Sequence, residues 1–171
     1  MDWRLIFVLV AFAIYLVYNA FALGCFGVPK SLSMTFYLFK EKKNWLCIWF
    51  PIMMFTMAGA LLPAWLEISN GSDLQFMAFL AAAGIIFTGA APAFESSDLE
   101  KRVHTGSAAF AALFALLWVA LVAHLWYVIL IWLVANTIIA FLTKTVKSRY
   151  IYWLETVAFL STFTAVLAYF V

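Results

Sequence analysis

The sequence predicts an all-α membrane protein, a six-transmembrane-helix bundle within one domain (1–171) and with a short interfacial segment after the first helix. Hydrophobic residues make up 68% of the chain and charged residues 11%, whereas a soluble domain is about half apolar and about a quarter charged. A chain of this length cannot bury that excess in one core, so most of it must face lipid. The apolar runs lack strand-like alternation, which favours helices over a barrel.

Six apolar runs are long enough to span, at about 20 residues each. The first of them is too long for a signal peptide and lacks a basic segment before it, so we expect it to be retained. The run from 106 to 143 is too long for a single span and predicts a tight reversal near His124. The expected helices are 3–24, 44–66, 74–94, 106–124, 125–143 and 150–170.

The distribution of basic residues orients this bundle. The outer face would carry Arg4 as its one basic residue, together with Glu67 and Asp73. Because Lys and Arg concentrate in cytoplasmic loops, both termini are expected outside the cytoplasm. Scattered over loops, the charges form no basic face for nucleic acid. The nine residues assigned to the cytoplasmic side are Lys30, Lys40, Lys42, Lys43, Lys101, Arg102, Lys144, Lys147 and Arg149.

The loop 28–44 is expected to hold a structured segment. Leu32, Phe36 and Phe39 recur at helical spacing, and lysines close the loop. Two interpretations remain open. The segment is either an amphipathic helix in the membrane interface with its lysines near acidic headgroups, or a re-entrant turn packed on the bundle.

The stretch 85–112 is expected to form the centre of the bundle. Gly84 and Gly89 precede its short polar loop, and Gly106 with several alanines follows it. In lipid, small residues let helix backbones approach closely. We therefore predict that the third and fourth helices pack tightly here, with the loop as a polar rim on the cytoplasmic side.

Glu155 is the one carboxylate inside a predicted span. A charge at the centre of a membrane helix costs roughly 2.5–3.5 kcal/mol on insertion scales, so such a residue usually faces protein or water. Thr162 lies on the same helical face, two turns further on. The functional interpretation is a polar site open to the cytoplasm; the alternative is a protonated or snorkelling glutamate paired with Lys147 or Arg149.

His104 stands at the expected cytoplasmic start of the fourth helix, near Glu95, Asp98 and Glu100. A histidine among carboxylates can bind a metal or move a proton, but more often such a residue belongs to a capped turn, here with Thr105 or Ser107 as the N-cap. His124 falls on the opposite face, so the two histidines cannot share one ion. Neither a metal site nor a cofactor is predicted.

Three short segments carry a family resemblance: SLSMTFY (31–37), GAAPAF (89–94) and VHTGSAA (103–109). Together with six helices, they resemble the small bacterial membrane proteins of unknown function related to the DRAM and FGF-receptor-activating-protein group, over residues 28–125. The resemblance implies a six-helix bundle in the bacterial inner (plasma) membrane and a lipid-linked role, because eukaryotic members are associated with lipid remodelling or lipid-dependent regulation. It points to Ser31, Ser33, Thr35, Tyr37, Pro92 and His104.

Three functional hypotheses follow. The leading one is a non-enzymatic protein that binds a membrane lipid or small ligand in a cytoplasmic-side polar pocket, with a second copy or another protein as a further partner. The first alternative is an intramembrane metal-dependent lipid hydrolase built on His104. The second is a small transporter or channel subunit using the polar stripe 155–162. The pocket residues of the leading hypothesis are Ser31, Ser33, Thr35, Tyr37, His104 and Glu155.

Overall fold

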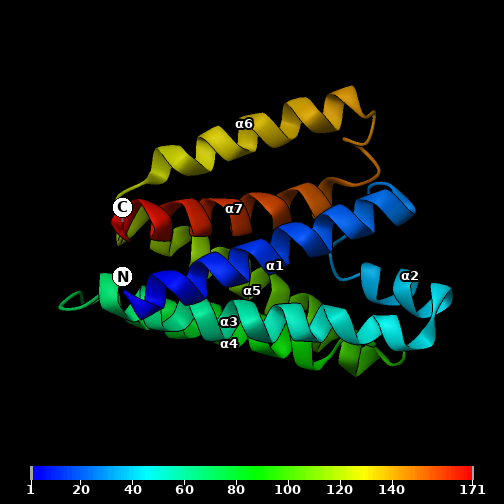
Figure 1. Ribbon diagram of the computed structural model, residues 1–171, viewed down its shortest axis with the longest axis horizontal. Helices are drawn as coiled ribbons and strands as arrows, with labels where there is room; N and C mark the ends of the chain where they lie inside the picture. The colour runs from blue at the N-terminus through cyan, green and yellow to red at the C-terminus, as the bar shows by residue number, and fades with distance from the viewer. Residues whose placement is uncertain (1, 171) are drawn as a thin grey trace.

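The computed structural model describes residues 2–170, and this part of the chain is all-helical (Figure 1). Each predicted apolar run corresponds to one long helix, and a short helix follows the first. The elements are α1 (Trp3–Phe26), α2 (Thr35–Lys42), the 3-10 turn η1 (Asn44–Ile48), α3 (Trp49–Ile68), α4 (Phe76–Ala90), α5 (Asp98–Leu121), α6 (Trp126–Leu142) and α7 (Tyr150–Phe170).

Within residues 2–170, four helical segments are long and apolar enough to cross a membrane: α1, η1 with α3, α5 and α7. The apolar helices α4 and α6 are shorter, with 15 and 17 residues. At 1.5 Å per residue they extend about 22 and 26 Å, against a hydrocarbon layer about 30 Å thick. The prediction of an all-α membrane protein is confirmed at this level, while two of the six expected spans fall short of the full thickness.

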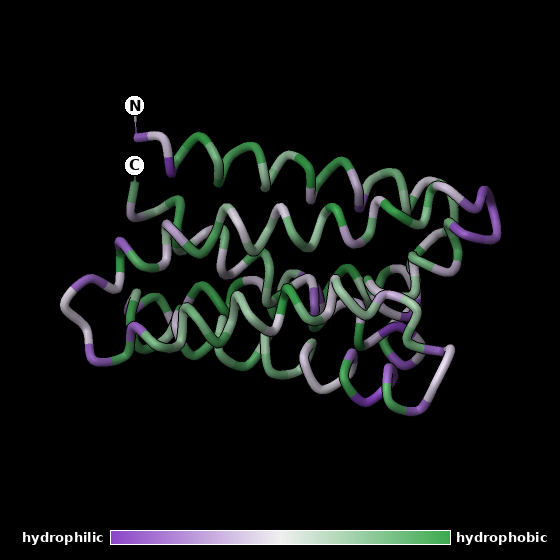
Figure 2. The backbone as a smooth tube through the Cα atoms, turned by 90° about the horizontal axis from the view of Figure 1, so that it is seen from below, coloured by the Kyte–Doolittle hydropathy of each residue, from purple (hydrophilic) through white to green (hydrophobic). Residues whose placement is uncertain are grey.

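The six long helices run along one axis, with both termini at the same end (Figure 1). Helix α4 packs between α3 and α5, and α6 lies at the edge of the bundle beside α7. Hydrophilic positions gather at the two ends, with hydrophobic stretches between them (Figure 2). This distribution matches what a bundle needs when lipid surrounds its middle and water reaches its ends.

An ion-pair cluster closes the end that holds the termini. Asp2 caps α1 by accepting from the Arg4 backbone amide, and the Arg4 guanidinium contacts the Asp2 carboxylate at 2.8 Å. Arg4 also pairs with Glu67 at the end of α3. The hydrogen bond from Arg4 lowers the pKa of Asp2 below its usual value. The expected placement of Arg4 and Glu67 on one face is confirmed.

Two glycines of α4 permit the close packing predicted for this region. A Cβ atom on Gly84 would lie 2.7 Å from the Cβ of Ala111 in α5, and one on Gly89 would lie 2.8 Å from the Cβ of Met54 in α3. Both distances are shorter than carbon atoms tolerate, so only glycine allows these contacts. Gly106, by contrast, has open space around its Cβ position.

The predicted start of the fourth helix at residue 106 is wrong. Helix α5 begins at Asp98, so most of the expected loop is its first two turns. The cap is Ser97, whose hydroxyl accepts from the Glu100 backbone amide and donates to the Glu100 carboxylate. Ser97 and Glu100 have the spacing of a capping box. The proposed caps Thr105 and Ser107 lie inside the helix instead.

The tight reversal predicted near His124 is confirmed. Helix α5 ends at Leu121 and α6 begins at Trp126. His124 sits between them in the left-handed region, with φ of 56°. A single residue with this conformation lets the chain turn back without the Gly or Pro that usually marks a reversal.

The loop after α1 forms the short helix α2, which is packed on the bundle. Phe39 is buried against Tyr18, Phe21 and Phe26 of α1, at ring distances of 5.3 to 5.5 Å. The lysines at its end are exposed. The segment is therefore amphipathic, and its apolar face is covered by protein. The segment is thus the amphipathic helix of the first interpretation, but it packs on the bundle as the second expected.

Candidate functional site

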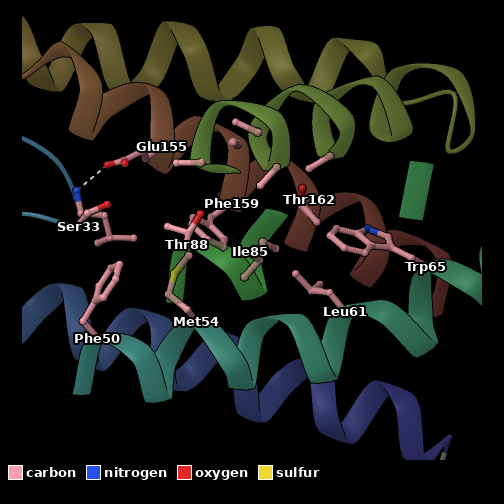
Figure 3. A pocket seen from close by; sticks show the side chains of 16 residues that line it. Ser33, Phe50, Met54, Leu61, Trp65, Ile85, Thr88, Glu155, Phe159 and Thr162 are labelled. Atoms are coloured by element: carbon pink, nitrogen blue, oxygen red, sulfur yellow. Dashed lines mark hydrogen bonds between the residues drawn. The ribbon is translucent and has the colours of Figure 1, made fainter. Parts of the chain in front are cut away.

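A cavity of about 50 Å³ lies inside the bundle between α3, α4, α5 and α7, with Leu32 and Ser33 at one end (Figure 3). Its wall from α5 consists of alanines at helical spacing, which share one face of the helix. The space exists because these side chains stop at Cβ. The alanines of this wall are Ala108, Ala111, Ala112 and Ala115.

Glu155 of α7 stands at the end of the cavity that is closed by the loop after α1. Its carboxylate accepts a hydrogen bond from the Leu32 backbone amide at 2.5 Å (Figure 3). The expected alternative, a pair with Lys147 or Arg149, is not formed. The ion pairs found among residues 2–170 are both made by Arg4. Glu155 thus faces a mainly apolar space without a cationic partner in the described chain.

The middle of the cavity is lined mainly by apolar side chains. Met54, Ile85 and Phe159 come from α3, α4 and α7 and meet in this part of the space (Figure 3). The polar exception is Thr88, whose hydroxyl donates to the Gly84 carbonyl at 2.8 Å and lies 3.0 Å from the Ser107 hydroxyl. A ligand filling this section would therefore need an apolar body.

Polar groups return at the opposite end, where Thr162 and Trp65 line the cavity (Figure 3). Thr162 lies seven positions after Glu155 in α7, about 10 Å along the helix at 1.5 Å per residue. Neither the Thr162 hydroxyl nor the Trp65 indole nitrogen has a hydrogen-bond partner within residues 2–170. The polar stripe expected along 155–162 therefore lies on the wall of one cavity.

Of the six predicted site residues, the structure brings Ser33 and Glu155 to the cavity. Ser31 and Thr35 make local bonds in the same loop. The Ser31 hydroxyl accepts from the Met34 amide at 3.1 Å. The Thr35 hydroxyl donates to the Leu32 carbonyl at 2.5 Å and also bonds the Tyr18 hydroxyl. Ser31 and Thr35 hold the loop in shape and do not line the cavity.

Tyr37 lies elsewhere, against the loop between α4 and α5. Its hydroxyl oxygen accepts from the Glu95 amide at 2.6 Å, and its ring packs edge-on against Phe94. Burial raises the pKa of Tyr37 above its usual value. Tyr37 therefore joins α2 to the loop 91–97 and is not one of the residues that line the cavity.

His104 is buried at 3% exposure in the second turn of α5 and is also outside the cavity lining. Its Nδ1 lies 2.9 Å from the Ala91 carbonyl, so Nδ1 carries the proton. Its ring stacks on Phe94 with centroids 4.4 Å apart. Nε2 is buried without a partner among the described residues. The His104 side chain is thus held by a hydrogen bond to the backbone and by stacking on an aromatic ring, and only Nε2 is left without a contact of this kind.

The geometry offers no support for the hydrolase alternative. Glu95 and Asp98 are exposed, and Glu100 is engaged in the capping box. Across residues 2–170, no three His, Cys, Asp or Glu side chains approach one another closely enough to hold one metal ion. His104 therefore has no companion ligands placed around Nε2.

Two other hollows are more open to the surroundings. One, of about 160 Å³, lies between α6 and α7 beside Asn136, whose amide donates to the Trp132 carbonyl. The other, of about 460 Å³, lies over the loop that carries Lys144 and Lys147. No residue that lines either one has a buried polar atom without a partner in the described chain. The cavity beside Glu155 is therefore the stronger candidate.

Sequence reasoning missed Trp65, Thr88 and the alanine wall. The alanines in α5 recur every three or four residues of the sequence, but this spacing by itself predicts close helix packing and not a cavity wall. Trp65 stands near the end of an apolar run, where aromatic residues of the membrane interface usually gather, so its position in the sequence does not distinguish it as a site residue. No family model, curated protein or solved structure matches this chain. What the cavity binds must therefore be inferred from the residues that line it.

Proposed function

We propose that this membrane protein binds a lipid or another small amphiphilic ligand in the cavity between α3, α4, α5 and α7. The polar end of the ligand would sit at Glu155 and Ser33, and its apolar part would extend past Met54 and Phe159. The proposal retains two residues of the predicted pocket, Ser33 and Glu155. It leaves Ser31, Thr35, Tyr37 and His104 as supports of the surrounding loops.

One observation carries the proposal: a carboxylate faces an apolar cavity without a cationic partner among residues 2–170. A carboxyl group in such surroundings must either find a partner or take up a proton, because an unpaired buried charge is costly. A hydrogen-bond donor or a cationic group on a ligand would supply that partner. The apolar section around Ile85 favours a hydrocarbon body over a hydrated ion, so it supports binding rather than conduction.

The alanine wall supplies the experiment. Ala112 lines the cavity and is half-buried, whereas Ala109, on the same helix, is exposed and does not line it. Ala112→Leu should fill the space, and Ala109→Leu should leave it open. Native mass spectrometry of the detergent-extracted proteins would then compare what co-purifies.

We expect about one equivalent of an amphiphile on the wild type and on Ala109→Leu, and loss of it from Ala112→Leu. Equal occupancy of the two variants, or no bound amphiphile on the wild type, would contradict the proposal. Glu155→Gln adds a second comparison, because it removes the charge while keeping the size of the side chain. It should lower the occupancy while leaving the helical content unchanged.

We further propose that α4 and α6 also cross the membrane, which gives six spans with both termini outside the cytoplasm, in a bacterial inner membrane. The proposed relationship to the DRAM-related group would fit this topology. The basic loops support the orientation.

Single cysteines at Asn70 and Ser96, both exposed, would test the orientation in a background without Cys25 and Cys47. An impermeant thiol reagent added to intact cells should label Asn70→Cys and spare Ser96→Cys; the reverse pattern would overturn the orientation.

A further inference from the structure

The cavity has a second polar end that the binding of a simple lipid tail would leave unused. We infer that the ligand carries a second polar group, an oxygen that accepts hydrogen bonds from Thr162 and Trp65, about 10 Å from the group that meets Glu155. This inference rests on the proposed function. It narrows the ligand class to extended amphiphiles that are polar at both ends.

The evidence is a pair of buried polar atoms without partners. Trp65 is 0% exposed and Thr162 is 2% exposed. The Trp65 indole nitrogen and the Thr162 hydroxyl form no hydrogen bond within the described part of the chain. Buried polar side chains almost always have a partner in native proteins. Because both side chains line the cavity, a molecule inside it is the nearest source of that partner.

The donor chemistry of these groups defines what they bind. An indole N–H can only donate, and a hydroxyl can donate or accept. The two together therefore favour an acceptor oxygen, from a hydroxyl, carbonyl or ether. Glu155 at the other end requires a donor. The two ends of the cavity thus favour different groups, which gives the ligand one orientation.

The apolar section between the ends sets the length of the ligand. Three bonds of an extended chain advance about 3.8 Å, so a hydrocarbon of about eight carbons spans the distance from Glu155 to Thr162. Met54, Ile85 and Phe159 surround this section (Figure 3). A chain of this size with a polar group at each end matches the polar, apolar and polar sections in order. Benzene already needs a cavity of about 150 Å³, so the side chains around the present space of about 50 Å³ must move apart to admit such a chain.

Ser161 provides a matched control. It is 0% exposed, and its hydroxyl also lacks a partner among residues 2–170, but it does not line the cavity. Thr162→Val removes the hydroxyl with little change in shape, and Thr162→Ser keeps it. Ser161→Ala removes a neighbouring buried hydroxyl without altering the cavity wall.

The experiment compares two probes by calorimetry, with the full chain in lipid nanodiscs and empty nanodiscs as the blank. Octylamine carries one polar end, and aminooctanol is the same chain with a hydroxyl on its far carbon. We expect aminooctanol to bind the wild type about fivefold more tightly than octylamine, as one added hydrogen bond predicts. Thr162→Val and Trp65→Phe should reduce this advantage, while Thr162→Ser and Ser161→Ala keep it.

The outcomes separate the two proposals. Suppose that octylamine binds, that Glu155→Gln weakens its binding, and that aminooctanol binds no more tightly than octylamine. The proposed function then stands, but the second polar group of the ligand is refuted, and the Thr162 end of the cavity holds water. An advantage that survives Thr162→Val also refutes it. If neither amine binds the wild type, the proposed function fails, and the inference fails with it.

Discussion

The carboxylate of Glu155 accepts a hydrogen bond from the backbone amide of Leu32, across 123 positions of the sequence. Neighbouring bonds reinforce this link between the start of α7 and the loop after α1. The Tyr152 amide donates to the Lys30 carbonyl at 3.3 Å, and the Tyr152 hydroxyl donates to Asn19 at 3.1 Å. The same carboxylate that faces the cavity therefore also holds the loop that closes it.

Replacing Glu155 should separate its role as an acceptor from its charge. Glu155→Ala leaves the Leu32 amide without a partner, which costs about 1–3 kcal/mol. Glu155→Gln keeps an amide oxygen that can accept the same bond. We expect thermal unfolding in detergent to place Glu155→Ala below Glu155→Gln in stability. Equal stabilities would mean that the bond to Leu32 contributes nothing.

The helices were largely predictable from the sequence, because lipid requires long apolar runs, and these are local properties. Hydrophobicity did not indicate the start of α5 at Asp98, because the first two turns of this helix are mostly polar; the capping box of Ser97 and Glu100 is the signal that marks it. The site was predictable only in part. Glu155 was evident as a lone carboxylate within a span, but the positions of Trp65 and the alanine wall depend on how four helices pack.

Gly84 is expected to be the most sensitive small residue of the bundle. A Cβ at this position would lie 2.7 Å from the Cβ of Ala111, so Gly84→Ala must push α4 and α5 apart. Overpacking of this kind typically costs about 1–3 kcal/mol. Gly59 is the control, because nothing lies within 4 Å of its Cβ position. Unfolding in detergent should show a lower stability for Gly84→Ala than for the wild type, and little change in stability for Gly59→Ala.

His124 is expected to tolerate glycine better than a branched residue. It is exposed and has φ of 56°, a conformation that glycine adopts freely and branched side chains avoid. His124→Gly should therefore unfold at the wild-type temperature or above it. His124→Val should be less stable by about 1–2 kcal/mol. The opposite order would show that the imidazole itself, and not the turn, stabilises this position.

The cluster at the termini should give a pH-dependent contribution to stability. Because Arg4 lowers the pKa of Asp2 in the folded protein, the contribution is complete above the unfolded pKa of 3.8 and is lost as the pH falls through the lower folded value. Asp2→Asn should therefore unfold more easily than the wild type at pH 7, with the difference shrinking as the pH falls below 3.8. A difference that is constant over this range would exclude an electrostatic origin.

The central claim is that an amphiphile occupies the cavity beside Glu155, and photo-crosslinking would test it most directly. The probe is octylamine with a diazirine in mid-chain, and the labelled residues are mapped by mass spectrometry. We predict labels on Met54, Ile85 or Phe159, which excess octylamine and Ala112→Leu both remove. Labels confined to lipid-facing residues such as Leu130 and Phe141, exposed on α6, with no competition, would contradict the claim.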